Sequence, residues 1–303
     1  MMGRKSKVVI GVVVLGAAAS LYGYYAATGS APQAEERSAT AGEALKFEEQ
    51  REESPRPGTG TSPSKDWAHL SSSAAESRFL ELRGRAEAGD VIAQRQLAEL
   101  FERCSVFSLS PSNMYSMLDA FARVRGASPT AYDGIKKRFS TVCSGVDGGQ
   151  VIPKDAYMTW LDKAARQGDP YAKVALASKN YSKLQASDYQ SLARDVVNSS
   201  DPEAVFALGD LLALAPQDSD LAEYRPAVTG PYANYAWGIA ACRMGADCGS
   251  DSYRMDSLCV NTGICNSGDY ESAIRTNAVP AGQQESLDKA IAEVQRVVGK
   301  KPI

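Results

Sequence analysis

The sequence predicts an all-α protein: an α/α-repeat solenoid, or superhelix of stacked helical hairpins, preceded by one N-terminal transmembrane helix and a disordered linker. Three observations carry this prediction. A hairpin pattern over residues 157–177 returns thirty-two residues later, over 189–209. Within each copy, apolar residues recur at the spacing of an amphipathic helix. A charge-free run of twenty residues lies near the start of the chain. A fixed period of about 20 to 50 residues is typical of stacked repeats.

The N-terminal segment predicts a membrane anchor. Residues 1–7 carry three basic side chains, and residues 8–27 carry no charge. At about 1.5 Å per residue, a helix over 8–27 spans roughly 30 Å, the thickness of the hydrocarbon core. The basic flank comes first, so we expect residues 1–7 in the cytoplasm and the rest exported. The prediction is a single-pass protein of the bacterial inner membrane, held in the lipid bilayer by 8–27, with a periplasmic C-terminal domain. The alternative is signal cleavage after 17–19, which releases a periplasmic or secreted protein.

Residues 28–72 are predicted to be a disordered linker. They are rich in Ala, Glu, Ser, Pro and Gly, and only Leu45, Phe47 and Trp67 could seed a core. Such a composition cannot offset the entropy lost on ordering. The only histidine, His69, lies at the end of this linker. A single histidine in a linker leaves no basis for most nucleophilic triads or imidazole metal sites.

Residues 73–146 are predicted to form an N-terminal helical module. Ser-Pro pairs at 110–111 and 128–129 are typical helix openings, and Gly126 ends a helix between them. The glycine-rich stretch 145–149 is a turn; it lacks the Lys-Ser/Thr that would make it a phosphate loop. The expected helices cover 74–88, 91–105, 111–125 and 129–143.

Residues 152–248 are predicted to be the repeat core. In its first unit an apolar stripe of Tyr157, Trp160, Leu161, Ala164 and Ala165 marks one helix. Gly168 suits the left-handed residue after that helix. Asp169 can accept from the free N–H groups that open the next helix, and Pro170 fits its first position. Gly-Asp-Pro therefore predicts a very short turn between antiparallel helices.

The second helix of each unit carries the pattern Asp-x-x-Ala-x-x-x-Leu-[Ala/Gly]. Copies begin at Asp90, Asp169 and Asp201, and a looser copy begins at Gly230. We expect the small residues to let neighbouring helices approach closely, while the leucine fills the groove between them. The alternative is an ordinary helical bundle with coincidental spacing.

Two of these segments, 86–101 and 160–173, resemble Sel-one-like repeats (SLR), which are relatives of the tetratricopeptide repeats. The resemblance covers 82–101 and 152–248, which is under half of the chain, and the usual glycine-rich turn within each repeat is missing. The stretch 104–151 also departs from the family pattern. The resemblance implies a right-handed α/α superhelix that serves as an adaptor, and it implies no single activity.

Residues 249–303 are predicted to hold a cysteine-containing segment and a C-terminal capping helix. A proline-containing connection over 215–230 and a helix over 231–244 come before it. The last amphipathic stretch, 287–298, ends at Gly299. We expect this helix to close the stack with one polar face.

The six cysteines all lie in the part predicted to be exported, and their even number predicts three disulfides. Cys104 and Cys143 each lie near a helix end with two helices between them. Their pairing would close a loop of about 40 residues and stabilise the fold by roughly 3–4 kcal/mol. The other four allow three pairings, or a zinc site that their five-residue spacings fit poorly; they are Cys242, Cys248, Cys259 and Cys265. There is no Cys-x-x-Cys redox motif.

Charge and motifs argue against several functional classes. The net charge of −3 and pI near 5.5 argue against nucleic-acid binding. The only short basic run in the folded part, 136–138, reads as a solvated helix face. A carboxylate pair for glycoside hydrolysis stays open, but Glu99, Glu102 and Asp210 lie on helix faces where solvation explains each. No Ser-x-x-Lys motif is present. We therefore predict no catalysis, no cofactor and no metal.

The sequence favours a membrane-anchored periplasmic helical-repeat scaffold that mediates protein–protein interaction with an unidentified envelope protein or peptide. The residues chosen for partner contact, at or beside equivalent repeat positions, are Tyr157, Lys173, Asn180 and Tyr189. Two alternatives remain: a peptidoglycan-binding or cell-wall-modifying protein, and a structural spacer. A cleft with perturbed carboxylates would favour an enzyme. A groove lined by repeat-equivalent polar and aromatic residues would favour a scaffold.

Overall fold

The computed structural model describes residues 70–153, 155–265 and 268–299, and within them it contains helices and irregular segments but no strand. The chain divides into two units, Met1–Thr59 and Gly60–Ile303, and the described residues all belong to the second. The expected all-α class is confirmed there. The predicted anchor, 8–27, lies outside the described residues, as does most of the predicted linker. None of the described helices is long and apolar enough to cross a membrane.

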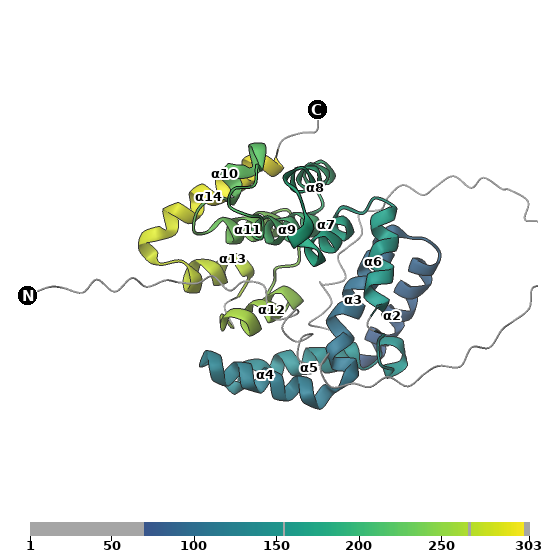
Figure 1. Ribbon diagram of the computed structural model, residues 1–303. Coiled ribbons are helices and arrows are strands. Elements are labelled where there is room, and N and C mark those ends of the chain that lie inside the picture. The colour runs from purple at the N-terminus through teal and green to yellow at the C-terminus, as the bar shows by residue number, and fades with distance from the viewer. Residues whose placement is uncertain (1–69, 154, 266–267, 300–303) are drawn as a thin grey trace, which may run out of the picture. The chain divides into compact units, whose positions relative to one another are not determined.

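Helices follow one another closely along the chain (Figure 1). The α-helices are α2 (Ser72–Glu87), α3 (Val91–Leu109), α4 (Pro111–Arg125), α5 (Pro129–Cys143), α6 (Ala156–Arg166), α7 (Pro170–Lys179), α8 (Ala186–Ser199), α9 (Pro202–Leu212), α10 (Arg225–Val228), α11 (Ala233–Arg243), α12 (Tyr253–Thr262), α13 (Tyr270–Ala273) and α14 (Gln284–Val298). Short 3₁₀ or π turns are η2 (Val146–Gly149), η3 (Tyr181–Lys183), η4 (Ala222–Tyr224), η5 (Ile274–Ala278) and η6 (Ala281–Gln283).

The repeated aspartates cap helices, as their spacing predicts. Asp90, Asp169 and Asp201 lie directly before α3, α7 and α9. Each carboxylate accepts a hydrogen bond from the backbone N–H three residues on, at 3.0, 2.7 and 3.0 Å respectively. Each cap satisfies one of the N–H groups that a helix start leaves without a partner. The three second helices of the repeat therefore begin in the same way.

The residue before each capping aspartate reverses the chain in the left-handed region. Gly89 and Gly168 have φ values of +94° and +98°, which a side chain rarely adopts. Ser200 occupies the equivalent place before α9 with φ of +54°. The glycine predicted to end the helix at 168 is confirmed.

The small residue that closes the repeat pattern marks close helix approach. A Cβ atom added to Gly209 on α9 would lie 2.3 Å from the Cβ of Trp237 on α11. One added to Gly238 would lie 2.8 Å from the ring of Tyr270. Trp237 is buried, and its indole N–H donates to the carbonyl of Ala227 at 3.0 Å. The [Ala/Gly] position is therefore small because a neighbouring helix occupies the space.

The irregular stretch between the first two repeat units is a helical hairpin, α4 and α5. Helix α3 runs to Leu109, four residues further than expected, and packs against both α2 and α6. The hairpin leaves α3 and is tied back by the disulfide between Cys104 and Cys143, whose Cα atoms are 5.2 Å apart. This pairing confirms the one predicted from the helix ends.

The C-terminal part packs around α11. The expected connection over 215–230 contains two short helical segments, η4 and α10. Helix α14 packs on α10 and α11, and its buried residues are Leu287, Ile291, Val294 and Val297. The four remaining cysteines pair locally, Cys242 with Cys248 and Cys259 with Cys265. All six cysteines are therefore oxidised, and no thiolate is left for the zinc alternative.

Candidate functional site

A cavity of about 240 Å³ lies where three second helices of the repeat meet α12. Glu99, Glu102 and Arg103 reach it from α3, and Tyr171 reaches it from α7. Further lining residues come from α9, from the loop between α11 and α12, and from α12 itself; they are Glu203, Phe206, Ala207, Asp210, Asp247, Tyr253, Arg254 and Ser257. We call this cavity the acidic pocket.

Much of the acidic pocket is built from equivalent positions of different repeats. Glu99 and Asp210 each follow their capping aspartate, Asp90 or Asp201, by nine residues. Tyr171 and Glu203 each follow theirs, Asp169 or Asp201, by two residues. These equivalent positions on different helices therefore meet at one pocket. The repeat register was therefore a signal in the sequence that could have located these side chains.

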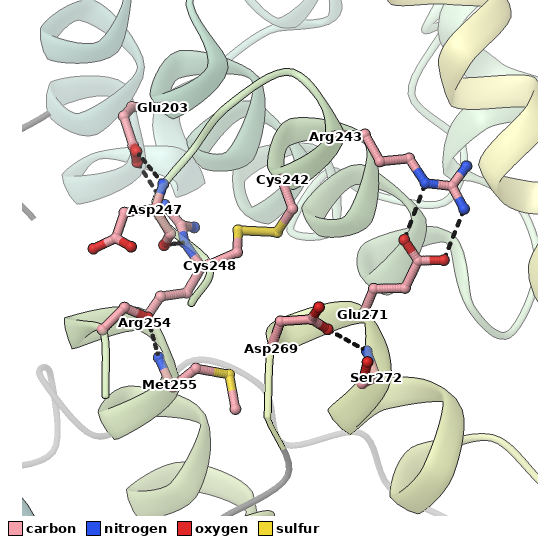
Figure 2. Close-up of a disulfide and its surroundings, with 11 residues drawn as sticks. Glu203, Cys242, Arg243, Asp247, Cys248, Arg254, Met255, Asp269, Glu271 and Ser272 are labelled. Carbon is pink, nitrogen blue, oxygen red and sulfur yellow. Dashed lines mark hydrogen bonds and ion pairs between the residues drawn. A yellow bond between two sulfur atoms is a disulfide. The ribbon is translucent and has the colours of Figure 1, made fainter. Parts of the chain in front are cut away.

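Arg254 holds α12 and its preceding loop to α9. Its guanidinium lies 2.5 Å from a carboxylate oxygen of Glu203, and its Nε donates to the carbonyl of Asp247 at 3.2 Å. Glu203 also accepts from the backbone N–H of Asp247 at 3.1 Å (Figure 2). The guanidinium carbon lies 3.3 Å from the ring centroid of Phe206, a cation–π contact. This arginine is therefore fully engaged within the protein.

Arg103 is engaged in a similar way on the α3 side. Its guanidinium carbon lies 4.4 Å from the ring centroid of Tyr253, and its NH2 nitrogen lies 3.5 Å from a carboxylate oxygen of Glu99. Burial raises the pKa of Glu99, and the charges of Arg103 and Arg95 oppose that rise. At the edge of the pocket, Lys179 lies 2.6 Å from Glu102.

Two carboxylates of the pocket have no cation at ion-pair distance among the described residues. Burial raises the pKa of Asp210 to about 6, against the opposing charge of Arg254. Asp247 keeps a buried Oδ2 atom without a hydrogen-bond partner. Its carboxylate points away from the nearby disulfide in Figure 2. Five carboxylates thus face two guanidinium groups, and the pocket carries a surplus of negative charge.

The Cys242–Cys248 disulfide holds the loop that supplies Asp247. The two Cα atoms lie 5.6 Å apart, and the carbonyl of Cys248 accepts from the backbone N–H of Tyr270 at 2.9 Å. Arg243, next to the disulfide, pairs with Glu271 through two hydrogen bonds of 2.7 and 3.0 Å (Figure 2). The loop is thus fixed to α11 and α13, which holds Asp247 at the pocket wall.

None of the four residues chosen from the sequence for partner contact lines this pocket. Tyr189 is completely buried, and its hydroxyl donates to the carbonyl of Tyr181 at 3.3 Å. Lys173 pairs with Asp195 at 2.8 Å. Asn180 is exposed at the end of α7.

Tyr157 is half-buried, and the ammonium of Lys179 lies 5.3 Å from its ring centroid. The structure instead brings together Glu99, Glu102 and Asp210, the carboxylates that the sequence analysis interpreted as solvated residues on helix faces. Within the described residues, no group of three or more potential ligands is arranged to hold a metal ion.

Comparison with known proteins gives no relative from which a function could be transferred. No family model matches the sequence, and no curated protein or solved structure matches it significantly. The function is therefore argued from the pocket alone.

Proposed function

We propose that this protein is a non-catalytic helical-repeat scaffold of the Sel-one-like type that binds a segment of a partner protein at the acidic pocket. The observation that carries the proposal is the composition of that pocket. Its walls include repeat-equivalent residues of the second helices, Glu99 with Asp210 and Tyr171 with Glu203. Helical-repeat proteins commonly bind their partners on a surface that successive repeats build together.

The repeat arrangement supports a solenoid. Helices α3, α7 and α9 start with the same aspartate cap, and α7 packs against α9 while α9 packs against α11. The α4–α5 hairpin is then an insertion within the array, because α3 packs directly on α6.

We further propose that the scaffold works in the periplasm, anchored by residues 8–27. The three disulfides support an oxidising compartment, because disulfides are rare in reducing cytosol. A reporter fused after Ile303 tests this topology. We expect it to be active only outside the cytoplasm. Activity confined to the cytoplasm would refute both the topology and the compartment.

In-cell crosslinking followed by mass spectrometry tests the binding role. A pocket variant carrying Asp210→Asn and Asp247→Asn removes two charges with little change of shape. A comparison variant carrying Lys173→Glu and Asn180→Arg alters the surface chosen from the sequence alone. We expect a crosslinked partner protein to be lost in the pocket variant and kept in the comparison variant. The reverse result would move the site to the α7 surface.

One observation favours a second candidate, a protein that acts on cell-wall glycan. A carboxyl with a pKa of about 6, such as Asp210, is suited to donate a proton near neutral pH, and glycoside hydrolysis needs one such acid beside a second carboxylate. Purified peptidoglycan incubated with the protein tests this. Release of soluble fragments that Asp210→Asn abolishes would establish it. If no fragments are released and a protein partner is captured, the result favours the scaffold. The remaining alternative, a spacer, has no use for a pocket of this kind.

A further inference from the structure

We infer that the acidic pocket recognises a primary ammonium group, such as the end of a lysine side chain. This inference rests on the proposed binding role of the same pocket and names the chemistry that enters it. It follows from the hydrogen-bonding capacity left unused at the pocket wall, from the arginines already present, and from the volume of the cavity.

The pocket wall holds carboxylate oxygens that could accept hydrogen bonds but receive none from the part of the chain that the structure describes. The Glu99 side chain is 9% exposed, and it accepts no hydrogen bond from the described residues; its nearest cation is Arg103 at 3.5 Å. Asp247 Oδ2 is buried without a donor. Desolvated carboxylates without donors are costly in a folded protein, so each gains when a donor-rich group arrives. An ammonium group offers three donors and no acceptor.

The arginines explain why an ammonium fits better than a guanidinium. A guanidinium is recognised best by a planar aromatic face and a bidentate carboxylate. Phe206 already stacks with Arg254, and Tyr253 already stacks with Arg103. The carboxylates without an ion-pair partner, Asp210 and Asp247, come from separate elements. Carboxylates that approach from different directions suit a compact point charge.

The volume argues for a side chain or a small amine. Pockets for drug-sized ligands measure about 300–1,000 Å³, and this cavity measures about 240 Å³. A glycan chain would also need donors for its hydroxyl oxygens, and both guanidinium groups are already paired within the protein. The ammonium can belong to a partner protein or to a free amine, because both present the same group.

Isothermal titration calorimetry of the purified full chain tests the inference. The probe is Nα-acetyl-lysine amide. Nα-acetyl-norleucine amide serves as its uncharged match, and Nα-acetyl-arginine amide as the guanidinium match. We expect saturable binding of the lysine probe, weaker at higher salt. We expect binding at least about tenfold weaker for the arginine probe and none for the norleucine probe. Equal binding of lysine and norleucine probes, or no binding of the lysine probe, overturns the inference.

Two variants locate the site. Asp210→Asn and Asp247→Asn should each weaken the lysine probe at least about tenfold. Asp195→Asn, which changes a carboxylate paired with Lys173 outside the pocket, should leave it unchanged. A lysine probe bound equally by all three variants is bound elsewhere, which also overturns the inference.

Failure of the ammonium inference can be distinguished from failure of the proposed scaffold function. If the lysine probe does not bind but crosslinking still loses a partner protein in the pocket variant, the scaffold stands and the ammonium inference fails. If the lysine probe binds and no partner protein is captured, the ammonium inference stands for a free amine and the scaffold fails. Cadaverine, a free diamine, then serves as the next probe.

Discussion

The guanidinium of Arg95 on α3 lies 2.5 Å from the carboxylate of Asp201, the residue that caps α9. The same NH1 nitrogen lies 3.5 Å from the carboxylate of Asp169, which caps α7. Arg95 is buried, with 6% of its surface exposed. Burial alone would lower the pKa of its guanidinium, but Glu99 and the two aspartates raise it above the ordinary value. One side chain of the first repeat therefore joins the helix starts of the next two.

Replacing this arginine should weaken the fold strongly. Arg95→Met leaves the carboxylates of Asp169 and Asp201 without their cation. Breaking a buried ion pair in this way costs about 3–5 kcal/mol. Arg166→Met is the matched control, because Arg166 pairs with Asp162 on the exposed surface of α6, where such pairs contribute about 0–1 kcal/mol. Urea unfolding measures both. Similar losses for the two variants would show that Arg95 does not join the repeats energetically.

Replacing a glycine by alanine should destabilise the protein where helices α9 and α11 approach closely, and stabilise it where the space is open. Gly209→Ala places a Cβ 2.3 Å from Trp237, and overpacking of this kind destabilises by about 1–3 kcal/mol. Gly84→Ala on α2 meets nothing within 4 Å, and in a helix it should stabilise by about 0.5–1 kcal/mol. Thermal unfolding compares the melting temperatures. A Gly209→Ala variant that melts at or above the wild-type temperature would contradict the packing described.

The disulfides should differ in their contribution to stability. The Cys104–Cys143 bond spans a sequence separation of 39 and the Cys242–Cys248 bond one of 6. In the chain-entropy model these loops correspond to about 4 and about 2 kcal/mol, respectively. We expect a Cys104→Ala, Cys143→Ala variant to lose more stability in urea than a Cys242→Ala, Cys248→Ala variant. The second variant should instead weaken the lysine probe, because its loop carries Asp247. The opposite order of stabilities would count against the entropic account.

Asp210 should make stability depend on pH in a defined direction. Its pKa is about 6 in the folded protein and about 3.8 when unfolded. Between these values the folded state binds more protons, so the free energy of unfolding falls as pH rises from about 4 to about 6. The difference corresponds to roughly 3 kcal/mol at most.

Asp210→Asn should therefore be more stable than wild type at pH 7 and lose that advantage below about pH 4. Denaturant titrations at pH 4, 5, 6 and 7 measure the difference, with Asp195→Asn as the exposed control. An advantage that does not change with pH would mean that Asp210 is well solvated. The same variant should lose the lysine probe, and a stabilised protein that no longer binds separates function from folding.

Local chemistry made part of this fold predictable. The aspartate caps at 90, 169 and 201 and the left-handed glycines at 89 and 168 depend on atoms within one helical turn. Such features follow from neighbouring residues, because the capping groups and the N–H groups they satisfy are close in the chain.

The pairing of Cys104 with Cys143 was also predictable, because Cys104 lies near the end of α3 and Cys143 is the last residue of α5, on the two sides of one hairpin. The pairing of the other four cysteines was not, since three of them, Cys248, Cys259 and Cys265, lie in a segment for which the sequence predicted no helix. The structure chose the two local bonds from three possible arrangements.

The acidic pocket could be identified only from the tertiary structure. Glu99 and Asp210 read as solvated helix-face carboxylates because one helix shows only its own periodicity. Asp247 and Arg254 lie in and after an irregular loop, 44 and 51 residues from Glu203, the residue that they bond. Repeat register could have shown that Glu99 and Asp210 are equivalent positions, but it could not show that α12 covers them.

The sequence by itself determined where the repeat helices begin, which residues cap them and which positions stay small, because those features depend on short-range geometry. Only the tertiary structure decided which carboxylates lose their water. Desolvation depends on side chains contributed by distant elements, here Phe206 from α9 with Tyr253 and Arg254 from α12. The raised pKa of Asp210 and the unpaired oxygen of Asp247 are thus properties of the packed protein, and the proposed binding depends on that unpaired oxygen.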